Sequence, residues 1–314
     1  MSTTESQSDT LDRECPLIDG RREIQRVPAR SSSVGGIPVA RSLPSRERRL
    51  IGAWCFLDHA GPAQFGPESD GLQVGPHPHT CLQTFTWMVA GELLHRDSLG
   101  HEQLIRPGQV NLMTAGRGIS HTEASPAGET ELHATQLWIA LPPKQRHVEP
   151  RFDHYPELPR FEIGGLDITL LIGEFENHKA PTLSYSPLMG LELRWSDNDE
   201  QSLTLREDFE YGILPLQGAL NVDGERFAED ELAYLGINRR EVSLRTEGEG
   251  RALLIGGEPL KEKITLWWNF VGYSRAEIEQ AQADWEAHSE RFGNIPKPNA
   301  PRMDAPKLPW TRRT

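Results

Sequence analysis

Short segments in which apolar and polar residues alternate dominate the chain from about residue 21 onward. In LQTFTWMV, at 82–89, the alternation is imperfect, but it still suits a strand with one buried face, because successive side chains of a strand point to opposite sides. Similar runs, bounded by Gly or Pro, lie at 54–57, 109–113 and 132–141. This pattern predicts antiparallel strands and an all-β fold.

A second block of short alternating runs follows a proline-rich stretch at 141–162. The five prolines of that stretch prevent a regular element, which indicates a domain boundary. The strands expected beyond it lie at 167–173, 191–195, 210–216 and 251–257. Between two short apolar runs, the pair Asp223-Gly224 predicts a tight hairpin turn.

The two blocks share a plan, which indicates an internal repeat. The segments 87–113 and 214–235 each contain a strand, a glycine (Gly91 or Gly218), a second strand, a turn and a further strand. Two stacked small β-barrels explain this repeat economically. The expected organisation is a disordered tail at 1–20, a first barrel at 21–150, a second barrel at 151–273, and a helix with an extended tail at 274–314.

The segment SRAEIEQAQADWEAHSERF predicts a helix over about 274–292. Ser274 and Glu277 have the spacing of a capping box, in which each side chain can bond a free backbone N–H of the first turn. Apolar residues recur at helical spacing, namely Ile278, Ala281 and Trp285. We therefore expect this helix to dock on a barrel through that face.

Composition narrows the class of protein further. The 314 residues include 33 Lys and Arg against 46 Asp and Glu, and the net charge of −13 argues against direct binding to nucleic acid. The chain has three cysteines, which form no CxxC pair and whose odd number does not suit a framework of paired disulfides. This cysteine usage suits a reducing compartment. The polar N-terminus and the lack of a long apolar run predict neither a signal peptide nor a membrane span. We expect a cytoplasmic protein.

Two pairs of ligand-type residues carry the candidate chemistry. His77 and His79 stand two apart, so on a strand both side chains face the same side and can hold one metal ion. Such a pair alone is a weak signal, and unliganded histidines in a metal-free barrel are the alternative. His121 and Glu123 repeat the spacing and add a third imidazole and a carboxylate. These donors suit Fe, Mn, Ni, Cu or Zn, with coordination positions left for substrate and dioxygen.

The chain resembles the pirin family of the cupin superfamily in the runs that contain these residues. The resemblance is densest in GLQVGPHPHTCLQTFTWMVAGELLHRDSLG at 71–100 and PGQVNLMTAGRGISHTEASP at 107–126, and it extends to 36–63 and 256–281. It implies two tandem cupin barrels, to which the capped segment at about 274–292 adds a short C-terminal helix. It also implies one metal ion in the first barrel, held by His77, His79, His121 and Glu123, with iron(II) as the expected ion and Mn, Ni, Cu or Zn as alternatives.

Two positions qualify the resemblance. Pirins usually carry a glutamate in the run after HPH, whereas this chain has Gln83; the implied ligands are unaffected, but the polar surroundings of the metal become doubtful. Measured from the repeat glycine, Thr204 and Arg206 stand in the second block where His77 and His79 stand in the first. Neither is a metal ligand, so we expect the second barrel to be metal-free.

The resemblance implies a quercetinase-type dioxygenase that cleaves a flavonol-like aromatic substrate with dioxygen, and Glu123 could also serve as the general base. Candidates for the apolar pocket wall are Phe56, Trp87 and Met113, with ordinary core packing as the alternative for each. Three histidines near these motifs in sequence are expected to be solvent-facing or hydrogen-bonded, namely His95, His101 and His133, and His59 is expected to be structural or at the edge of the pocket. The rival hypothesis is a non-enzymatic metal-binding regulatory protein that docks a protein partner.

Overall fold

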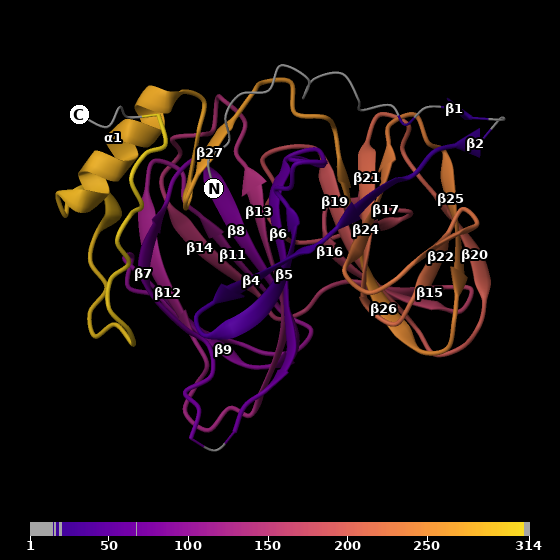
Figure 1. Ribbon diagram of the computed structural model, residues 1–314, viewed down its shortest axis with the longest axis horizontal. Coiled ribbons are helices and arrows are strands. Elements are labelled where there is room, and N and C mark those ends of the chain that lie inside the picture. The colour runs from indigo at the N-terminus through magenta and orange to yellow at the C-terminus, as the bar shows by residue number, and fades with distance from the viewer. Residues whose placement is uncertain (1–14, 16, 19–20, 67, 311–314) are drawn as a thin grey trace.

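The computed structural model describes residues 15, 17–18, 21–66 and 68–310. In it the chain forms two β-barrels side by side, with a helix at the outer end of the first (Figure 1). This confirms the predicted all-β fold of two cupin-like barrels with a C-terminal helix. Most of the tail expected at 1–20 lies outside the described residues; within it, β1 (Leu17–Ile18) pairs with β2 (Arg21–Arg22).

The first barrel consists of a larger and a smaller antiparallel sheet. The larger sheet has the order β14 (Arg151–Tyr155), β11 (Val110–Thr114), β8 (Leu82–Gly91), β13 (Glu131–Ala140), β6 (Trp54–Gln64), β5 (Ile37–Leu43) and β4 (Arg30–Val34). The smaller sheet has the order β10 (Glu102–Ile105), β9 (Leu93–Asp97), β12 (Ile119–Ala124) and β7 (Gln73–His79). The prediction that 141–162 holds no regular element is wrong: β14 forms between its prolines and pairs with β11, so this part of the stretch still belongs to the first barrel.

The second barrel repeats this plan. Its larger sheet has the order β15 (Arg160–Ile163), β16 (Leu166–Ile172), β19 (Leu188–Trp195), β26 (Gly250–Gly257), β21 (Glu210–Gln217), β24 (Glu231–Gly236) and β3 (Gln25–Pro28). Its smaller sheet has the order β20 (Glu200–Thr204), β25 (Glu241–Thr246), β22 (Leu220–Val222) and β23 (Glu225–Phe227). The short hairpin β17 (Glu174–Phe175) with β18 (His178–Lys179) lies between β16 and β19 in sequence. The N-terminal strand β3 thus extends a sheet made of residues far along the chain.

The repeat glycines occupy equivalent turns in the two barrels. Gly91 ends β8 with a φ of 75°, and Gly218 directly follows β21 with a φ of 72°, a region that favours glycine. A Cβ on Gly91 would lie 2.2 Å from the Glu131 carbonyl oxygen, so both conformation and space require glycine there. The predicted hairpin is also present, because Asp223 and Gly224 have φ values of 49° and 90° between β22 and β23.

The larger sheets of the two barrels pack against each other through a shared apolar core. Trp54 of β6 contacts Phe85 of β8 edge-on and donates a 3.1 Å hydrogen bond from Nε1 to the Gly256 carbonyl of the second barrel. Leu214 and Leu253 of the second barrel belong to the same buried cluster. The larger sheets are therefore buried on both faces, which explains why their strands alternate imperfectly in sequence.

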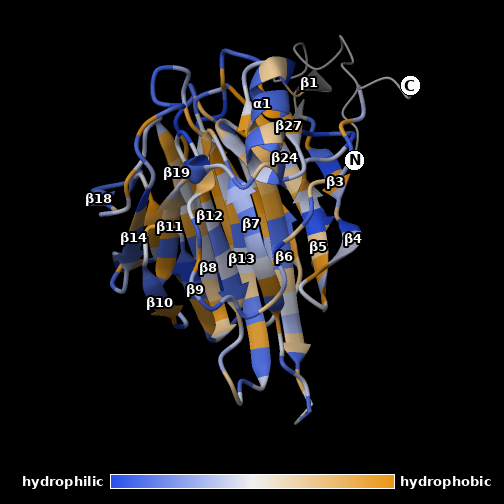
Figure 2. Ribbon diagram, turned by 90° about the vertical axis from the view of Figure 1, so that its left-hand side faces the viewer, coloured by the Kyte–Doolittle hydropathy of each residue, from blue (hydrophilic) through white to orange (hydrophobic). Residues whose placement is uncertain are grey.

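The C-terminal segment covers the outer end of the first barrel. After the hairpin β27 (Thr265–Trp267) and β28 (Phe270–Gly272), the helix α1 (Arg275–Glu286) and the turn η1 (Glu290–Phe292) follow. Ser274 caps the helix by accepting from the Glu277 N–H, and the buried face contains the predicted residues Ile278, Ala281 and Trp285. Figure 2 shows α1 at one end of the barrel strands.

The last described residues run across the first barrel as an extended strap. Met303 donates a 2.9 Å backbone hydrogen bond to Pro76 of β7. A Cβ on Gly75 would lie 1.9 Å from the Pro301 carbonyl oxygen, so a glycine at that position admits the strap. No helix in the described part of the chain is both long and apolar enough to span a membrane.

Candidate metal centre

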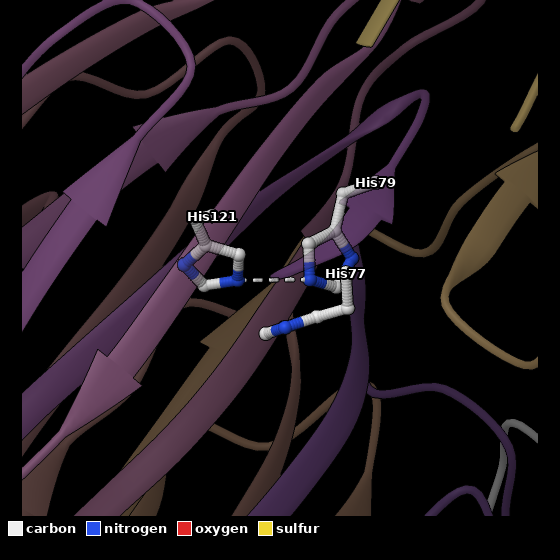
Figure 3. A group of neighbouring side chains, drawn as sticks. All are labelled: His77, His79 and His121. Atoms are coloured by element: carbon white, nitrogen blue, oxygen red, sulfur yellow. Dashed lines mark hydrogen bonds between the residues drawn. The ribbon is translucent and has the colours of Figure 1, made fainter. Parts of the chain in front are cut away.

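Three histidines meet where the adjacent strands β7 and β12 pair in the smaller sheet of the first barrel. In the register of these strands, His121 lies opposite His77, and Ile119 lies opposite His79. Figure 3 shows the three imidazole rings converging from the two strands. The pairing register therefore joins the two motifs that the sequence places far apart.

The ring nitrogens are spaced as ligands of one ion. One ligand nitrogen from each of His77, His79 and His121 lies within 4.8 Å of the other two. Nε2 of His79 and Nε2 of His121 are 3.1 Å apart, close to the roughly 3 Å expected for two nitrogens bound at right angles to one ion at about 2.1 Å. All three side chains are buried. This donor set fits a divalent transition metal.

Backbone carbonyls orient two of the rings. Nδ1 of His77 donates to the Gly75 carbonyl and Nδ1 of His79 donates to the Asn269 carbonyl, each over 2.9 Å. With Nδ1–H engaged, Nε2 of each ring is left as the free lone pair for a metal. Burial lowers the pKa of His77 to about 4 and holds the pKa values of His79 and His121 well below 6.5. The rings are therefore neutral near pH 7, as metal ligation requires.

Glu123 lines the same space but is not part of the close group of three. A register shift in β12 falls between His121 and Glu123, so the carboxyl does not simply repeat the position of His121. Its Oε1 accepts a 3.4 Å hydrogen bond from the Thr86 hydroxyl, and burial raises the pKa of this carboxyl to about 7. A ligand role for Glu123 stays a prediction, and its protonation near neutral pH suits a group that exchanges protons.

A second pair on β9 supports the site: His95, which the sequence analysis expected to be solvent-facing or hydrogen-bonded, and Asp97, which it did not name. Nδ1 of His95 lies 3.4 Å from Nδ1 of His121, and Nε2 of His95 lies 3.3 Å from Asp97. An ionised Asp97 accepts from His95 Nε2–H, so the Nδ1 lone pair of His95 faces the Nδ1–H of His121 and leaves Nε2 of His121 for the ion. His101 also donates to Asp97, over 2.9 Å. The HxD spacing of His95 and Asp97 is the signal that could have identified them.

His59 and His133 lie elsewhere, at the seam between the barrels. Nδ1 of His59 is 2.7 Å from Asp230 of the second barrel, and Nε2 of His59 is 2.8 Å from Nε2 of His133. Glu229 joins His59 and Asp230 in a second group of ligand-type side chains. Because both ring nitrogens of His59 already have protein partners, this group forms a hydrogen-bonded link between the barrels.

A cavity of about 1040 Å³ opens from the three histidines toward the surface. Phe56 lines it together with Trp138, and the two rings stack 4.1 Å apart. The other candidates for the wall, Trp87 and Met113, do not line this cavity. Both lie in the apolar core, which was the alternative given for each of them.

Gln83 takes no direct part in the site. Its amide nitrogen donates to the Thr114 hydroxyl over 3.0 Å and to the Leu183 carbonyl over 3.4 Å, and it is fully buried. The residue that departs from the pirin pattern therefore contacts β11 and the segment between β18 and β19 of the second barrel rather than the three histidines.

The second barrel offers no matching centre within the described residues. Thr204 is exposed at the end of β20, and Arg206 is ion-paired with Asp208. Among the described residues, the groups spaced to hold an ion are the three histidines and the seam group that includes His59. The buried candidate centre thus lies in the first barrel.

Comparisons with known proteins agree with this architecture. A model described as Pirin matches residues 36–139, and a model of the Pirin C-terminal cupin domain matches residues 190–293. A Pseudomonas aeruginosa protein named "Putative quercetin 2,3-dioxygenase" is 54% identical over 99% of this chain and 98% of its own length. A pirin-like protein of Caulobacter vibrioides is 36% identical over 82% of this chain and 91% of its own length.

Solved structures show the same arrangement. A crystal structure titled quercetin 2,3-dioxygenase from Acinetobacter baumannii is 48% identical, has a TM-score of 0.90, and covers 92% of this chain and 97% of its own. A bacterial pirin from Escherichia coli, solved in complex with nickel(II), shares the fold with a TM-score of 0.60 at 17% identity, over 76% of this chain and 100% of its own. Because the two Pirin family models match both barrels of this chain, it belongs to the pirin family.

Proposed function

We propose that this pirin is a metal-dependent dioxygenase that cleaves a flavonol-like aromatic substrate. The observation that carries the proposal is the placement of three buried, neutral imidazoles and the Glu123 carboxyl on a single cavity large enough for a polycyclic ligand. The names of the relatives in P. aeruginosa and A. baumannii support the same substrate class.

In the proposed site, His77, His79 and His121 hold the ion, with Glu123 as the fourth ligand. Iron(II) is the proposed ion; the E. coli pirin was solved with nickel(II), which supports keeping other divalent metals as alternatives. When bound, such an ion supplies open coordination positions and redox chemistry beside the substrate.

The side chains of the cavity bind the substrate and move its proton. Glu123 takes the proton of the flavonol 3-hydroxyl, which leaves an electron-rich anion facing the histidines. The stacked rings of Phe56 and Trp138 offer an apolar wall for the aromatic substrate. In the overall reaction both atoms of dioxygen enter the product, the two ring bonds to carbon 3 break, and carbon 3 leaves with its oxygen as carbon monoxide.

The test is a carbon monoxide assay with flavonols under air, after metal analysis of the native protein and reconstitution with iron(II), Mn, Ni, Cu or Zn. The proposal requires carbon monoxide release that depends on the metal and disappears in a His121→Ala variant. If no metal supports flavonol oxidation, the enzyme hypothesis loses to the rival, in which the metal-loaded protein docks a protein partner.

A further inference from the structure

A row of polar side chains crosses the inner face of the larger sheet in the first barrel. In the strand register, Gln136 of β13 lies opposite Thr86 of β8 on one side and opposite Asp58 of β6 on the other. Asp58 in turn lies opposite Arg41 of β5. Residues paired in register point to the same face of a sheet, and all four of these residues line the cavity. They therefore form one continuous polar line across the cavity wall.

Two contacts across the barrel place this polar row beside the candidate metal centre. The Thr86 hydroxyl lies 3.4 Å from Oε1 of Glu123, which belongs to β12 of the smaller sheet. Trp138, two residues beyond Gln136 on β13, meets the His79 ring edge-on, with 5.0 Å between the ring centroids. Residues two apart on a strand lie on the same face, about 7 Å from each other. Gln136 therefore has the histidine end on one side and Glu123 on the other.

Within the described chain, the amide of Gln136 is bonded through its oxygen but not through its nitrogen. Oε1 of Gln136 accepts a 2.7 Å hydrogen bond from the Thr86 hydroxyl, which fixes the orientation of the amide. Nε2 of Gln136 has no hydrogen-bond partner among the described residues, although the side chain lines the cavity. The two N–H donors on this nitrogen are therefore held in place and free to bind a ligand.

The chemistry of this row limits the ligand group that it can recognise. An amide nitrogen only donates, so its partner must be an acceptor such as a carbonyl oxygen. On the far side of Gln136, each carboxylate oxygen of Asp58 already accepts a 2.6 Å hydrogen bond from Arg41, and the pair carries no net charge. The row therefore suits a neutral acceptor. A site of this kind rejects an analogue without the acceptor, because the protein donor is then left unpaired.

We infer that Gln136 determines specificity by donating a hydrogen bond from Nε2 to a substrate carbonyl on the carbon next to the one that bears the chelating hydroxyl. This inference rests on the proposed function for the chelating end. In a flavonol the 4-carbonyl adjoins the 3-hydroxyl, so a hydroxyl directed at the histidines and Glu123 brings the carbonyl to the neighbouring position, where Gln136 lies. The preferred substrates are planar aromatic compounds with a hydroxyl and a carbonyl on adjacent carbons.

The experiment measures binding of two probes to the iron(II)-reconstituted protein without oxygen, by fluorescence titration. The probes are 3-hydroxyflavone and its 4-thione, in which sulfur, a weaker acceptor, replaces the carbonyl oxygen. Gln136→Met keeps the length of the side chain but removes its donors. We expect this variant to bind 3-hydroxyflavone about threefold to tenfold more weakly than the wild type, and the thione less than about twofold more weakly. Differences in chelation cancel, because each probe is compared with itself.

Two further variants and a spectroscopic measurement separate recognition from packing. Gln136→Glu keeps the shape of the side chain but replaces the donors by a carboxyl, so it should weaken 3-hydroxyflavone binding more than Gln136→Met does, and it carries the same comparison if the Met variant folds poorly. Gln64→Met, at an exposed glutamine of β6 that does not line the cavity, is the matched control and should bind both probes like the wild type. In difference infrared spectra, the carbonyl stretch of bound 3-hydroxyflavone should move to higher frequency in Gln136→Met, because the carbonyl loses a donor.

The outcomes separate this inference from the proposed function. Equal losses for the two probes in the Gln136 variants, or an unmoved carbonyl stretch, overturn the inference even if quercetin is oxidised in air with release of carbon monoxide. The inference is also overturned if neither probe binds the wild type. A loss confined to 3-hydroxyflavone, with the shifted stretch, supports it even if no flavonol is turned over, in which case only the dioxygenase proposal fails.

Discussion

Glu123 is proposed to act both as a metal ligand and as the general base, and the two roles can be tested separately. It is a carboxyl with a pKa raised to about 7 by burial, beside three neutral imidazoles that could hold an ion without it. Its contribution to metal retention should therefore be smaller than its contribution to proton transfer.

Replacing Glu123 by Gln should lower metal occupancy only partly and reduce flavonol turnover by about 10²–10⁴-fold, the usual effect of losing a general base. Some activity should return at higher pH, as more of the flavonol ionises unaided. The measurement is turnover at equal metal content over a pH series. Thr86→Val is the control, because it removes the hydroxyl that contacts Glu123 and Gln136 but leaves the Glu123 carboxyl. Wild-type turnover in the Gln variant would exclude Glu123 as the base.

Asp97 acts on the site through His95. Burial opposes its ionisation, but hydrogen bonds from His95 and His101 hold the pKa of this carboxyl below its ordinary value. As an anion, Asp97 fixes which nitrogen of His95 carries a proton and therefore how His95 faces His121.

Replacing Asp97 by Asn should weaken metal binding by about 10–100-fold, as is common when a residue that orients a metal ligand is lost. The measurement is a competition titration against a chromophoric chelator. His101→Asn removes a half-exposed partner of Asp97 but leaves the Asp97–His95 contact, so it should change affinity much less. Equal losses in both variants would show that the effect is structural.

The helix α1 and the hairpin before it act on the site as one element. Trp285 is buried between the helix and the strap, with its Nε1–H bonded to the Met303 carbonyl over 2.9 Å. The same segment supplies the Asn269 carbonyl that orients His79. Packing at the end of the chain therefore supports His79, a candidate metal ligand near its beginning.

Truncating Trp285 to Ala should lower the free energy of unfolding by about 3–5 kcal/mol, the usual range for a buried Trp. Metal affinity should fall as well, because the Asn269 carbonyl loses its support. Urea denaturation and metal titration measure the two effects. As a control, Ser274→Ala removes only the helix cap; it should lower the free energy of unfolding by about 1 kcal/mol and leave metal affinity near wild type. Unchanged metal affinity in the Trp285 variant would argue that the segment does not hold Asn269.

At the scale of the whole molecule, buried neutral histidines make stability depend on pH. Burial lowers the pKa of His77 and of His133 to about 4, below the 6.5 of an unfolded chain. As the pH falls below 6.5, the unfolded state binds protons that the folded state does not, so folding becomes less favourable. The raised pKa of Glu123 has the opposite sign and offsets part of this loss between pH 7 and 4.5.

The metal-free protein should therefore lose about 2 kcal/mol or more of stability between pH 7 and pH 5. Urea denaturation in the presence of a chelator measures this loss at the two pH values. A Glu123→Gln variant should show a larger loss, because the opposing contribution is gone. A midpoint that is equal or higher at pH 5 contradicts the assignment of these histidines as neutral.

Metal content is a second property of the whole chain. We expect a single divalent transition metal per chain, bound in the first barrel, because Thr204 and Arg206 replace the ligand positions in the second and His59 is already bonded on both nitrogens. Elemental analysis should give one ion in the wild type and none in His121→Ala. Two ions per chain would contradict this and direct attention to His59, Glu229 and Asp230.

The sequence alone determined the features that depend on residues close together in the chain. A period of two in hydrophobicity predicted the strands, the Asp223-Gly224 pair predicted a turn with positive φ values, and the capped apolar stripe predicted α1. The spacing of His77 and His79 placed both on one face of a strand. The family resemblance joined this pair to His121, which the pairing of β7 with β12 then showed in space.

Only the tertiary structure decided the features that depend on which strands become neighbours. Alternation tells which side of a strand is apolar, but not whether that side meets a cavity or the other barrel; Phe56 therefore lines the cavity while Trp87 lies in the shared core. Likewise, the approach of His95 to His121 and of Asn269 to His79 depends on strand pairing and on the return of the C-terminal segment. These contacts join residues far apart in the chain, and no local pattern encodes them.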